Sequence, residues 1–306
     1  MSSLPPKISV IIPTKNEQDA IGQLVREIRE VLNGSESEIV VVDASNDNTA
    51  SEALAAGARM VRQIGAGGFG EAIMQGIYWS KGEYIVTMDG DGTYDPKDIP
   101  KLLDPLIKDE ADLVNGDRFA NMQDGAMPHL NRLGNRLLTK FGNFLFRTDL
   151  NDSQSGMKAF RREILRYLAL FEKGFSSCSE LIAETSKAHF RMVEVGINYK
   201  PRIGETKLNP ASDGPGIFWS SVKMMIDYRP MILFGGFGLA FIVVGFAVAW
   251  PVIVTFVVEN RFVMMGRALI ALFCWIVGTL SVFTGILLNA INMSFERITG
   301  RAKQLS

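Results

Sequence analysis

Two aspartates, Asp89 and Asp91, stand two positions apart in the stretch YIVTMDGDGTYDP (residues 84–96) and are suited to chemistry. A glycine separates them, so a turn can direct both carboxylates toward one ligand. Mg²⁺ and Mn²⁺ prefer oxygen ligands and usually share them between carboxylates and substrate phosphates. A cation held in this way neutralises a diphosphate leaving group. The alternative is an acidic turn that binds nothing.

The secondary-structure elements that position this pair are short apolar segments, which alternate along the chain with segments of helical periodicity. Strands of this kind, separated by helices, predict an α/β domain with a Rossmann-like, largely parallel sheet and helices on both faces. Ligands bind beyond the carboxyl ends of the strands in such sheets. The predicted strands are residues 7–13, 37–43, 58–63 and 83–89, and the predicted helices are residues 17–32, 48–58 and 69–80.

Polar side chains follow three of these predicted strands. Any one of them could be a turn or helix-cap residue. Together they exceed what capping requires, so we expect one binding site along this edge of the sheet. The residues are Pro13, Thr14 and Glu17 after the first strand, Asp43 and Ser45 after the second, and Asp89 and Asp91 after the fourth.

A glycine-rich segment, Gly65-x-Gly67-x-x-Gly70, superficially matches a dinucleotide-binding fingerprint. That fingerprint should follow the first strand and precede an acidic residue placed for a ribose. Here it follows the third predicted strand, and no acidic residue is so placed. We therefore interpret the segment around Gly67 as a turn that lets a sugar nucleotide approach the backbone.

The successive motifs resemble those of family 2 glycosyltransferases with the GT-A fold. Downstream segments resemble the dolichyl-phosphate mannose synthase branch, which includes polyprenyl-phosphate hexosyltransferases. The resemblance covers about residues 7–210, in order. Its motifs are Pro13-Thr14-x-Asn16-Glu17, Asp43-x-Ser45-x-Asp47-x-Thr49, Asp89-x-Asp91, NGDRF (115–119), NRLGNRLLT (131–139), DSQSGMKAFRRE (152–163) and YKPRIGETKLNP (199–210).

The resemblance implies a role for each matched residue. Pro13, Thr14, Glu17, Asp43, Ser45, Asp89, Arg202 and Lys207 would bind the nucleotide sugar; Asp89, Asp91 and Thr93 would bind Mg²⁺ or Mn²⁺; Arg118, Arg132 and Asn135 would receive the acceptor phosphate. Asp91, Asp152, Arg118 and Arg132 would carry catalysis. The segment around Thr93 departs from the commonest family pattern. The resemblance therefore supports Thr93 as a metal ligand less directly than it supports Asp89 and Asp91.

The chemistry of a polyprenyl phosphate favours this assignment. A phosphate monoester has a second pKa of about 6, so it is largely a dianion and already nucleophilic. It needs cations to position it more than a general base. Arginine binds phosphate through two parallel hydrogen bonds. A sugar-hydroxyl acceptor would need a base, for which Glu180 is a candidate, but we interpret Glu180 as an orienting or helix-capping carboxylate.

Two stretches, Met231–Val258 and Ala268–Met293, contain no charged residue. A membrane helix needs about 20 apolar residues, so a two-helix transmembrane domain is predicted in residues 231–306, with spans at about 231–258 and 268–293. A pair of buried core helices is the alternative. Residues 214–230 predict an amphipathic helix, which lies on the bilayer surface or packs on the soluble domain.

The remaining sequence features predict on which side of the membrane the catalytic domain, residues 1–213, lies. The N-terminus lacks the apolar core of a signal peptide. Lysines and arginines flank the spans on the side of this domain and the C-terminal tail, which places both in the cytoplasm. We therefore expect an integral protein of the cell membrane or an endoplasmic-reticulum-like membrane.

The predicted function is inverting, metal-dependent transfer of a hexose from GDP-mannose or UDP-glucose to polyprenyl (dolichyl) phosphate. A processive polysaccharide synthase is one alternative, but it usually shows Gln-x-x-Arg-Trp and more spans, and neither occurs. A non-catalytic nucleotide-sugar-binding protein would lack the metal ligands or the arginines.

Composition limits the classes of ligand and partner that the protein is expected to bind. A net charge of −1 gives no sign of nucleic acid, and Cys178 and Cys274, the two cysteines, have neither a disulfide nor a zinc spacing. The sequence leaves open whether the protein forms a homo-oligomer.

Overall fold

The computed structural model describes residues 8–65, 68–170, 174, 176–203, 219, 222–261 and 264–305, the last eleven of them by their backbone alone. The chain divides into two compact units, Met1–Gly214 and Pro215–Ser306. Gly67, Lys207 and much of the expected helix 214–230 lie outside the described residues. Residues 222–228 of that helix are helical.

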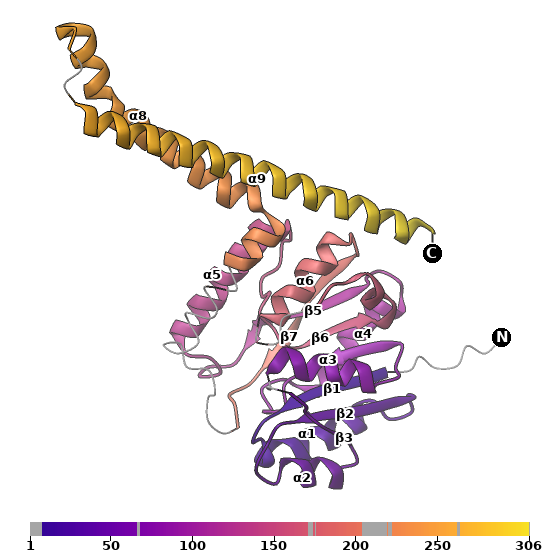
Figure 1. Cartoon of the computed structure of the whole chain (residues 1–306). Helices are drawn as coiled ribbons and strands as arrows, with labels where there is room; N and C mark the ends of the chain where they lie inside the picture. The colour runs from indigo at the N-terminus through magenta and orange to yellow at the C-terminus, as the bar shows by residue number, and fades with distance from the viewer. Residues whose placement is uncertain are drawn as a thin grey trace. The chain divides into compact units, whose positions relative to one another are not determined.

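A seven-stranded sheet forms the centre of the first unit (Figure 1). Its strand order is β3-β2-β1-β4-β6-β5-β7, and every neighbouring pair is parallel except the two that β6 makes with β4 and β5. The α/β class and the largely parallel sheet are therefore confirmed. The strands are β1 (Ile8–Thr14), β2 (Ser37–Asp43), β3 (Arg59–Arg62), β4 (Tyr84–Thr87), β5 (Leu113–Met122), β6 (Lys158–Arg161) and β7 (Met192–Tyr199).

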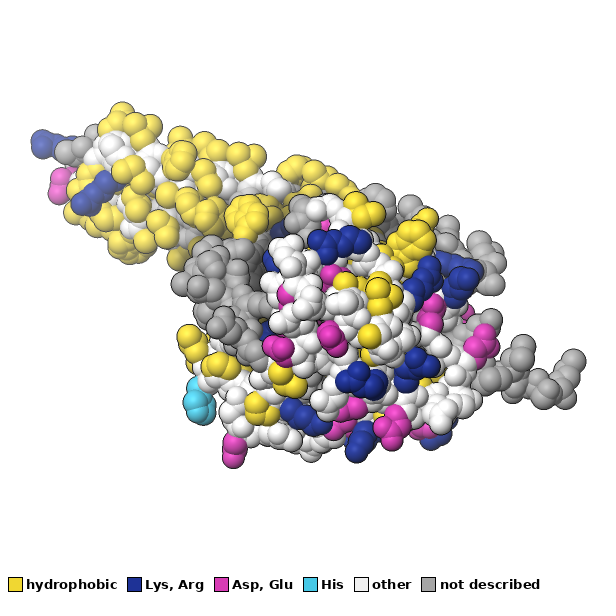
Figure 2. All heavy atoms as spheres, turned by 90° about the horizontal axis from the view of Figure 1, so that it is seen from below, with side chains coloured by type: hydrophobic (Ala, Val, Ile, Leu, Met, Phe, Trp, Pro, Cys, Tyr) yellow, Lys and Arg dark blue, Asp and Glu magenta, His cyan; other side chains and the backbone are white. Residues whose placement is uncertain are grey.

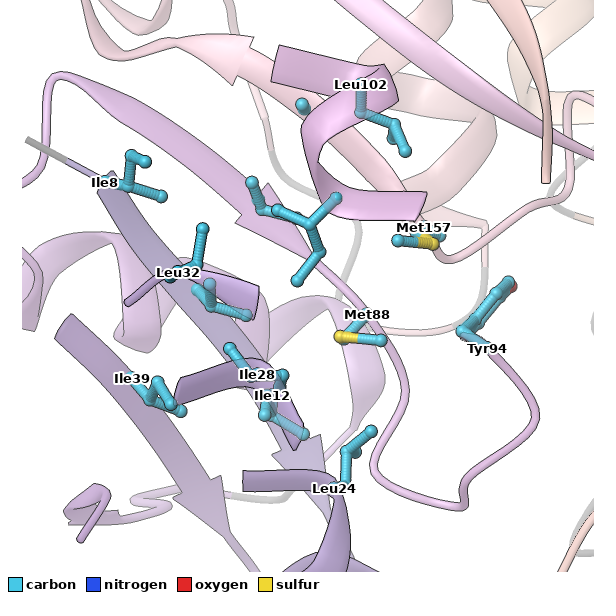
Figure 3. Packing of buried hydrophobic residues seen from close by; sticks show 14 of the residues in the cluster. Ile8, Ile12, Leu24, Ile28, Leu32, Ile39, Met88, Tyr94, Leu102 and Met157 are labelled. Carbon is cyan, nitrogen blue, oxygen red and sulfur yellow. The ribbon is translucent and has the colours of Figure 1, made fainter. Parts of the chain in front are cut away.

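Helices cover both faces of this sheet because successive strand residues point to opposite sides. Val10 and Ile12 join a buried cluster with residues of α1 and α4 (Figure 3). Ile11, between them, joins a second cluster with residues of α3 and α6. The helices of this unit are α1 (Gln18–Val31), α2 (Thr49–Ala55), α3 (Phe69–Trp79), α4 (Ile99–Ile107), α5 (His129–Phe146) and α6 (Ser177–Lys187), with 3₁₀ turns η1 (Pro96–Asp98) and η2 (Arg162–Tyr167).

The register brings the predicted polar residues to one edge of the sheet. Thr14, the last residue of β1, pairs with Asp43, the last residue of β2. Strand β4 runs parallel to β1 on its other side and ends at Thr87. The carboxyl ends of β1, β2 and β4 therefore point the same way, and Asp89 belongs to the loop beyond β4 rather than to the strand.

The second unit contains two long helices, α8 (Pro230–Glu259) and α9 (Met265–Leu305). Pro230–Glu259 and Met265–Ser294 are long and apolar enough to cross a membrane, and only 17% and 22% of their most apolar windows are buried. Figure 2 shows hydrophobic side chains over much of their surface. Both predicted spans lie within these helices.

Glycines let α8 and α9 approach each other closely. A Cβ atom added at Gly238 of α8 would lie 2.6 Å from the carbonyl oxygen of Gly278 in α9, and one added at Gly278 would lie 2.7 Å from that of Gly238. Small residues at such contacts bring two helix backbones close enough for dispersion forces to hold them together. In a bilayer these forces matter because burial of apolar side chains does not favour helix association there.

Replacement of Gly238 by leucine tests this contact. Gly238→Leu should loosen the pair of helices, since overpacking costs about 1–3 kcal/mol. We expect buried Cys274 of α9 to react with a maleimide in detergent about fivefold faster or more. Gly236→Leu is the matched control because a Cβ atom there meets nothing within 4 Å. Equal labelling rates in the two variants would contradict the close contact.

Candidate active site

Asp43 ties the ends of three strands together. Its Oδ1 atom accepts hydrogen bonds from the Thr14 hydroxyl at 2.9 Å and from the Ser45 backbone N–H at 3.2 Å, and the Ser45 hydroxyl donates to it as well. Its Oδ2 atom accepts from Arg62 Nη1 at 3.3 Å, at the end of β3. The structure thus brings Thr14, Asp43 and Ser45 together as predicted. Arg62 was missed because a charged residue ending a short strand carries no distinctive sequence signal.

The loops after β1 and β2 are joined by further hydrogen bonds. The backbone N–H of Asn16, which has a positive φ of 55°, donates to the Ser45 hydroxyl at 2.7 Å. The side chain of Asn16 accepts from the backbone N–H of Asn46 at 3.0 Å. The backbone N–H of Glu17 donates to the Thr49 hydroxyl at 2.8 Å. These bonds fix the polar residues beyond β1 and β2 as one rigid edge.

The two aspartates beyond β4 have different surroundings. Oδ1 of Asp91 accepts hydrogen bonds from the Thr93 backbone N–H at 3.1 Å and from its hydroxyl at 2.7 Å. Oδ1 of Asp89 is buried and accepts no hydrogen bond within the described residues. Burial, with the nearby charge of Asp91, raises the pKa of Asp89 to about 7. A Cβ atom at Gly156 would lie 2.6 Å from this oxygen, so a side chain there would displace the carboxylate of Asp89.

These two carboxylates fit a divalent cation. The cation would supply a partner for the enclosed oxygen of Asp89 and would add positive charge to that of Arg202, which already lies beside Asp91. Across the residues that the structure describes, no group of three or more His, Cys, Asp and Glu side chains could hold a metal ion. The arrangement therefore suits Mg²⁺ or Mn²⁺ that completes its coordination with waters and substrate phosphates.

Arg202 lies between two of the predicted acidic residues. The backbone N–H groups of Lys200 and Ile203 donate to the carbonyl oxygens of Thr93 at 2.8 Å and Asp91 at 3.2 Å, so the chain after β7 lies along this loop. The guanidinium of Arg202 pairs with Glu17, and its Nη1 atom lies 3.4 Å from Oδ2 of Asp91. A phosphate group that enters here would compete with both carboxylates for Arg202.

Arg118 and Asp152 form a buried bidentate ion pair. Nε of Arg118 lies 2.6 Å from Oδ2 of Asp152, and Nη2 lies 2.8 Å from Oδ1. Asp152 is fully buried and Arg118 nearly so, with the guanidinium 5.4 Å from the ring centre of Tyr199. Asp152 therefore holds Arg118 in place.

Lys158 is a buried cation that the sequence did not single out, although it lies in the matched motif DSQSGMKAF. Its ammonium donates to Oδ1 of Asn115 at 2.6 Å and to the carbonyl oxygen of Ser155. Burial lowers the pKa of Lys158. These bonds hold the loop that carries Asp152 and Gly156, and so support both Arg118 and the surroundings of Asp89.

The remaining predicted acceptor residues lie on α5. Arg132 has its guanidinium 6.0 Å from the ring centre of Phe119, the residue that follows Arg118. Its Nε atom is buried and donates to no acceptor among the described residues. Asn135 donates to the sulfur of Met127 at 3.4 Å. Glu180 is buried in the first turn of α6, where it lines an apolar pocket between α3 and α6.

The raised pKa of Asp89 predicts a pH-dependent metal affinity. Asp89 must lose its proton to bind a cation, so the affinity of the full chain for Mn²⁺ should rise with pH and level off above about 7. Below that pH it should fall about tenfold per unit. Calorimetry in two buffers of different ionisation enthalpy, at pH 6 and pH 8, measures both affinity and proton release. Equal affinities at the two pH values would contradict this assignment.

Comparison with known proteins identifies the family of this chain. The family model described as "Glycosyl transferase family 2" matches residues 9–168. Glycosyltransferase AglJ of Haloferax volcanii is 34% identical over 259 residues, which cover 84% of this chain and 84% of that protein. A protein of the same organism named dolichyl-phosphate hexose transferase is 36% identical over 223 residues, covering 72% of this chain and 95% of that protein.

A solved structure shares the fold. Glucosyl-3-phosphoglycerate synthase from Mycobacterium tuberculosis, in complex with Mg²⁺ and uridine diphosphate, matches with a TM-score of 0.59 at 23% identity. The match covers 72% of this chain and 78% of that chain. The predicted GT-A-like fold is thereby confirmed. Because the family match spans both the edge built around Asp43 and the aspartate pair, the protein is a glycosyltransferase and the chain belongs to glycosyl transferase family 2.

Proposed function

We propose that this protein transfers a hexose, with inversion, from a nucleotide sugar to the phosphate of a polyprenyl lipid. One observation carries the proposal. Asp89 has an enclosed carboxylate oxygen that accepts no hydrogen bond among the described residues, and two arginines, Arg202 and Arg118, lie in the same site. Such a site suits two substrates that both carry phosphate. The relative named dolichyl-phosphate hexose transferase supports this choice of acceptor.

The donor binds along the edge built by β1, β2 and β4. The base and ribose lie on the polar residues after β1 and β2, and the diphosphate lies over the aspartate loop. Arg202 then leaves Glu17 and Asp91 for the diphosphate, because a phosphate binds a guanidinium through charge-assisted hydrogen bonds. The residues assigned to the donor are Pro13, Thr14, Glu17, Asp43, Ser45, Asp89 and Arg202, with Gly67 and Lys207 as further predictions outside the described residues.

Asp89 and Asp91 would hold a divalent cation. Mg²⁺ or Mn²⁺ bound there would supply positive charge that stabilises the departing diphosphate. Thr93 donates its hydroxyl to Asp91 and so orients that carboxylate. The further role of Thr93 as a metal ligand stays a prediction.

Transfer requires one bond to form as another breaks. An oxygen of the acceptor phosphate attacks the anomeric carbon on the face opposite the diphosphate. The new carbon–oxygen bond forms while the bond to the diphosphate breaks, which inverts the carbon. The nucleoside diphosphate leaves with the electron pair. An acceptor phosphate with a second pKa of about 6 has little need of a base, which fits an Asp152 that is engaged with Arg118.

Arg118 and Arg132, with Asn135, position the acceptor phosphate. The pairing with Asp152 uses Nε and Nη2 of Arg118, so Nη1 remains for a phosphate oxygen. The enclosed Nε of Arg132 offers another donor.

The membrane supplies the lipid. Helices α8 and α9 cross the bilayer, and the first unit lies on the cytoplasmic side, as the flanking lysines and arginines favour. The helical residues 222–228 lie at the bilayer surface. This placement lets the phosphate of a membrane-embedded acceptor reach a soluble donor.

Transfer into lipid tests the proposal directly. Labelled GDP-mannose and UDP-glucose are offered in turn to the full chain with a polyprenyl phosphate, and label is counted in the organic extract. We expect one donor to be used, EDTA to stop transfer, and Mn²⁺ or Mg²⁺ to restore it. If purified, metal-loaded protein that binds a nucleotide sugar transfers no label into lipid, the proposed acceptor is wrong.

Asp91→Asn should lower the transfer rate about 100-fold or more, since the cation contributes several kcal/mol of charge stabilisation. The measurement is kcat with saturating donor and acceptor. Asp104→Asn is the matched control, because Asp104 is an exposed aspartate of α4 that pairs with Lys108. A rate for Asp91→Asn close to that of the control would remove Asp91 from the metal site.

A further inference from the structure

Helix α5 carries an exposed apolar stripe beside a row of cations. It contains no acidic residue. Positions three, four and seven apart lie on one side of a helix, so the members of each set lie along the same side. The stripe consists of Leu130, Leu133, Leu137 and Phe144, each between 57% and 68% exposed, and the row consists of Arg132, Arg136 and Lys140.

Rows of this kind are typical of a helix at a lipid surface. Large apolar side chains on a soluble surface mark a contact with another phase or partner. A helix with apolar and basic rows binds at the surface of an anionic bilayer. The same chain contains two helices long and apolar enough to cross a membrane.

Two of these cations share one aromatic ring. The guanidinium carbons of Arg132 and Arg136 lie 6.0 Å and 5.3 Å from the ring centre of Phe119. A ring attracts cations within about 6 Å of its centre. Neither guanidinium forms an ion pair or hydrogen bond within the part of the chain that the structure describes. The ring thus gathers two positive charges with no carboxylate among those residues to balance them.

We propose that Phe119 and Arg136 complete the acceptor site, with the ring holding Arg132 and Arg136 as a pair that binds the phosphate monoester of the lipid acceptor. The inference rests on the proposed function and extends it, because Arg136 and Phe119 had no role there. Two guanidinium groups match the double charge of a phosphate monoester. Phe119 directly follows Arg118 in β5, so the same strand carries the ring of this pair and the arginine that we assign to the acceptor phosphate.

The phosphodiester of an ordinary anionic lipid offers similar chemistry with a single charge. The double charge of the monoester favours the acceptor as the ligand of this pair. Two assay settings separate the sources: a short-chain prenyl phosphate in neutral detergent, and a long-chain polyprenyl phosphate in vesicles with or without phosphatidylglycerol.

Steady-state kinetics of the full chain test the proposal. Arg136→Ala should raise the KM for the short-chain acceptor in neutral detergent about tenfold or more and leave the KM for the donor unchanged. One charge-assisted hydrogen bond is worth about that factor. Phe119→Leu should raise the acceptor KM several-fold, and Arg136→Lys should retain part of the affinity. Lys140→Ala, one turn further along α5, should change it less than twofold.

Three outcomes would overturn the proposal. The first is an acceptor KM for Arg136→Ala that equals that of Lys140→Ala. The second is an effect confined to vesicles with phosphatidylglycerol, which would assign the pair to bilayer lipids. The third outcome applies if the wild type transfers no hexose. Calorimetry then compares the affinities of the wild type and of Arg136→Ala for the short-chain prenyl phosphate, and equal affinities would exclude the arginine pair. A weaker affinity of Arg136→Ala would retain the pair and reject only the proposed reaction.

Discussion

Two carboxylates beyond β4 cannot both carry a charge in an enclosed site without positive charge beside them. The surroundings of Asp89 and Asp91 follow from this constraint. Thr93 donates to Asp91, Arg202 approaches it from the chain after β7, and Gly156 leaves room beside the enclosed oxygen of Asp89. These surroundings suit the cation and the donor phosphates that we propose for this site.

A second layer of buried polar contacts surrounds Arg118, which we propose for the acceptor phosphate. The Arg118–Asp152 pair takes up a carboxylate that could otherwise act as a base, and Lys158 holds the loop that carries Asp152. Buried charges are stable only when they are paired and fully hydrogen-bonded. These contacts suit a reaction whose nucleophile is already charged, because such a reaction gains most from fixed positions.

The sequence predicted the first half of the sheet well. Residues 8–87 form strands and helices with clear periodicity, and the strand β4 is buried along its whole length. The antiparallel strand β6 and the order of the last three strands were not predicted, because pairing between distant segments leaves no local pattern. Both apolar helices were predicted, since an uncharged run longer than about 20 residues is typical of a helix that crosses a bilayer.

Residue type and spacing by themselves determined the α/β class, the apolar helices and the aspartate pair. Chain topology decided the rest, because contacts such as Asp43 with Arg62, or Asp152 with Arg118, join residues that lie far apart in sequence. Only the folded chain shows that Asp152 is engaged and that the Nε of Arg132 lacks a partner among the described residues. Burial and partner geometry set the charge state of a side chain, and neither is encoded in its identity.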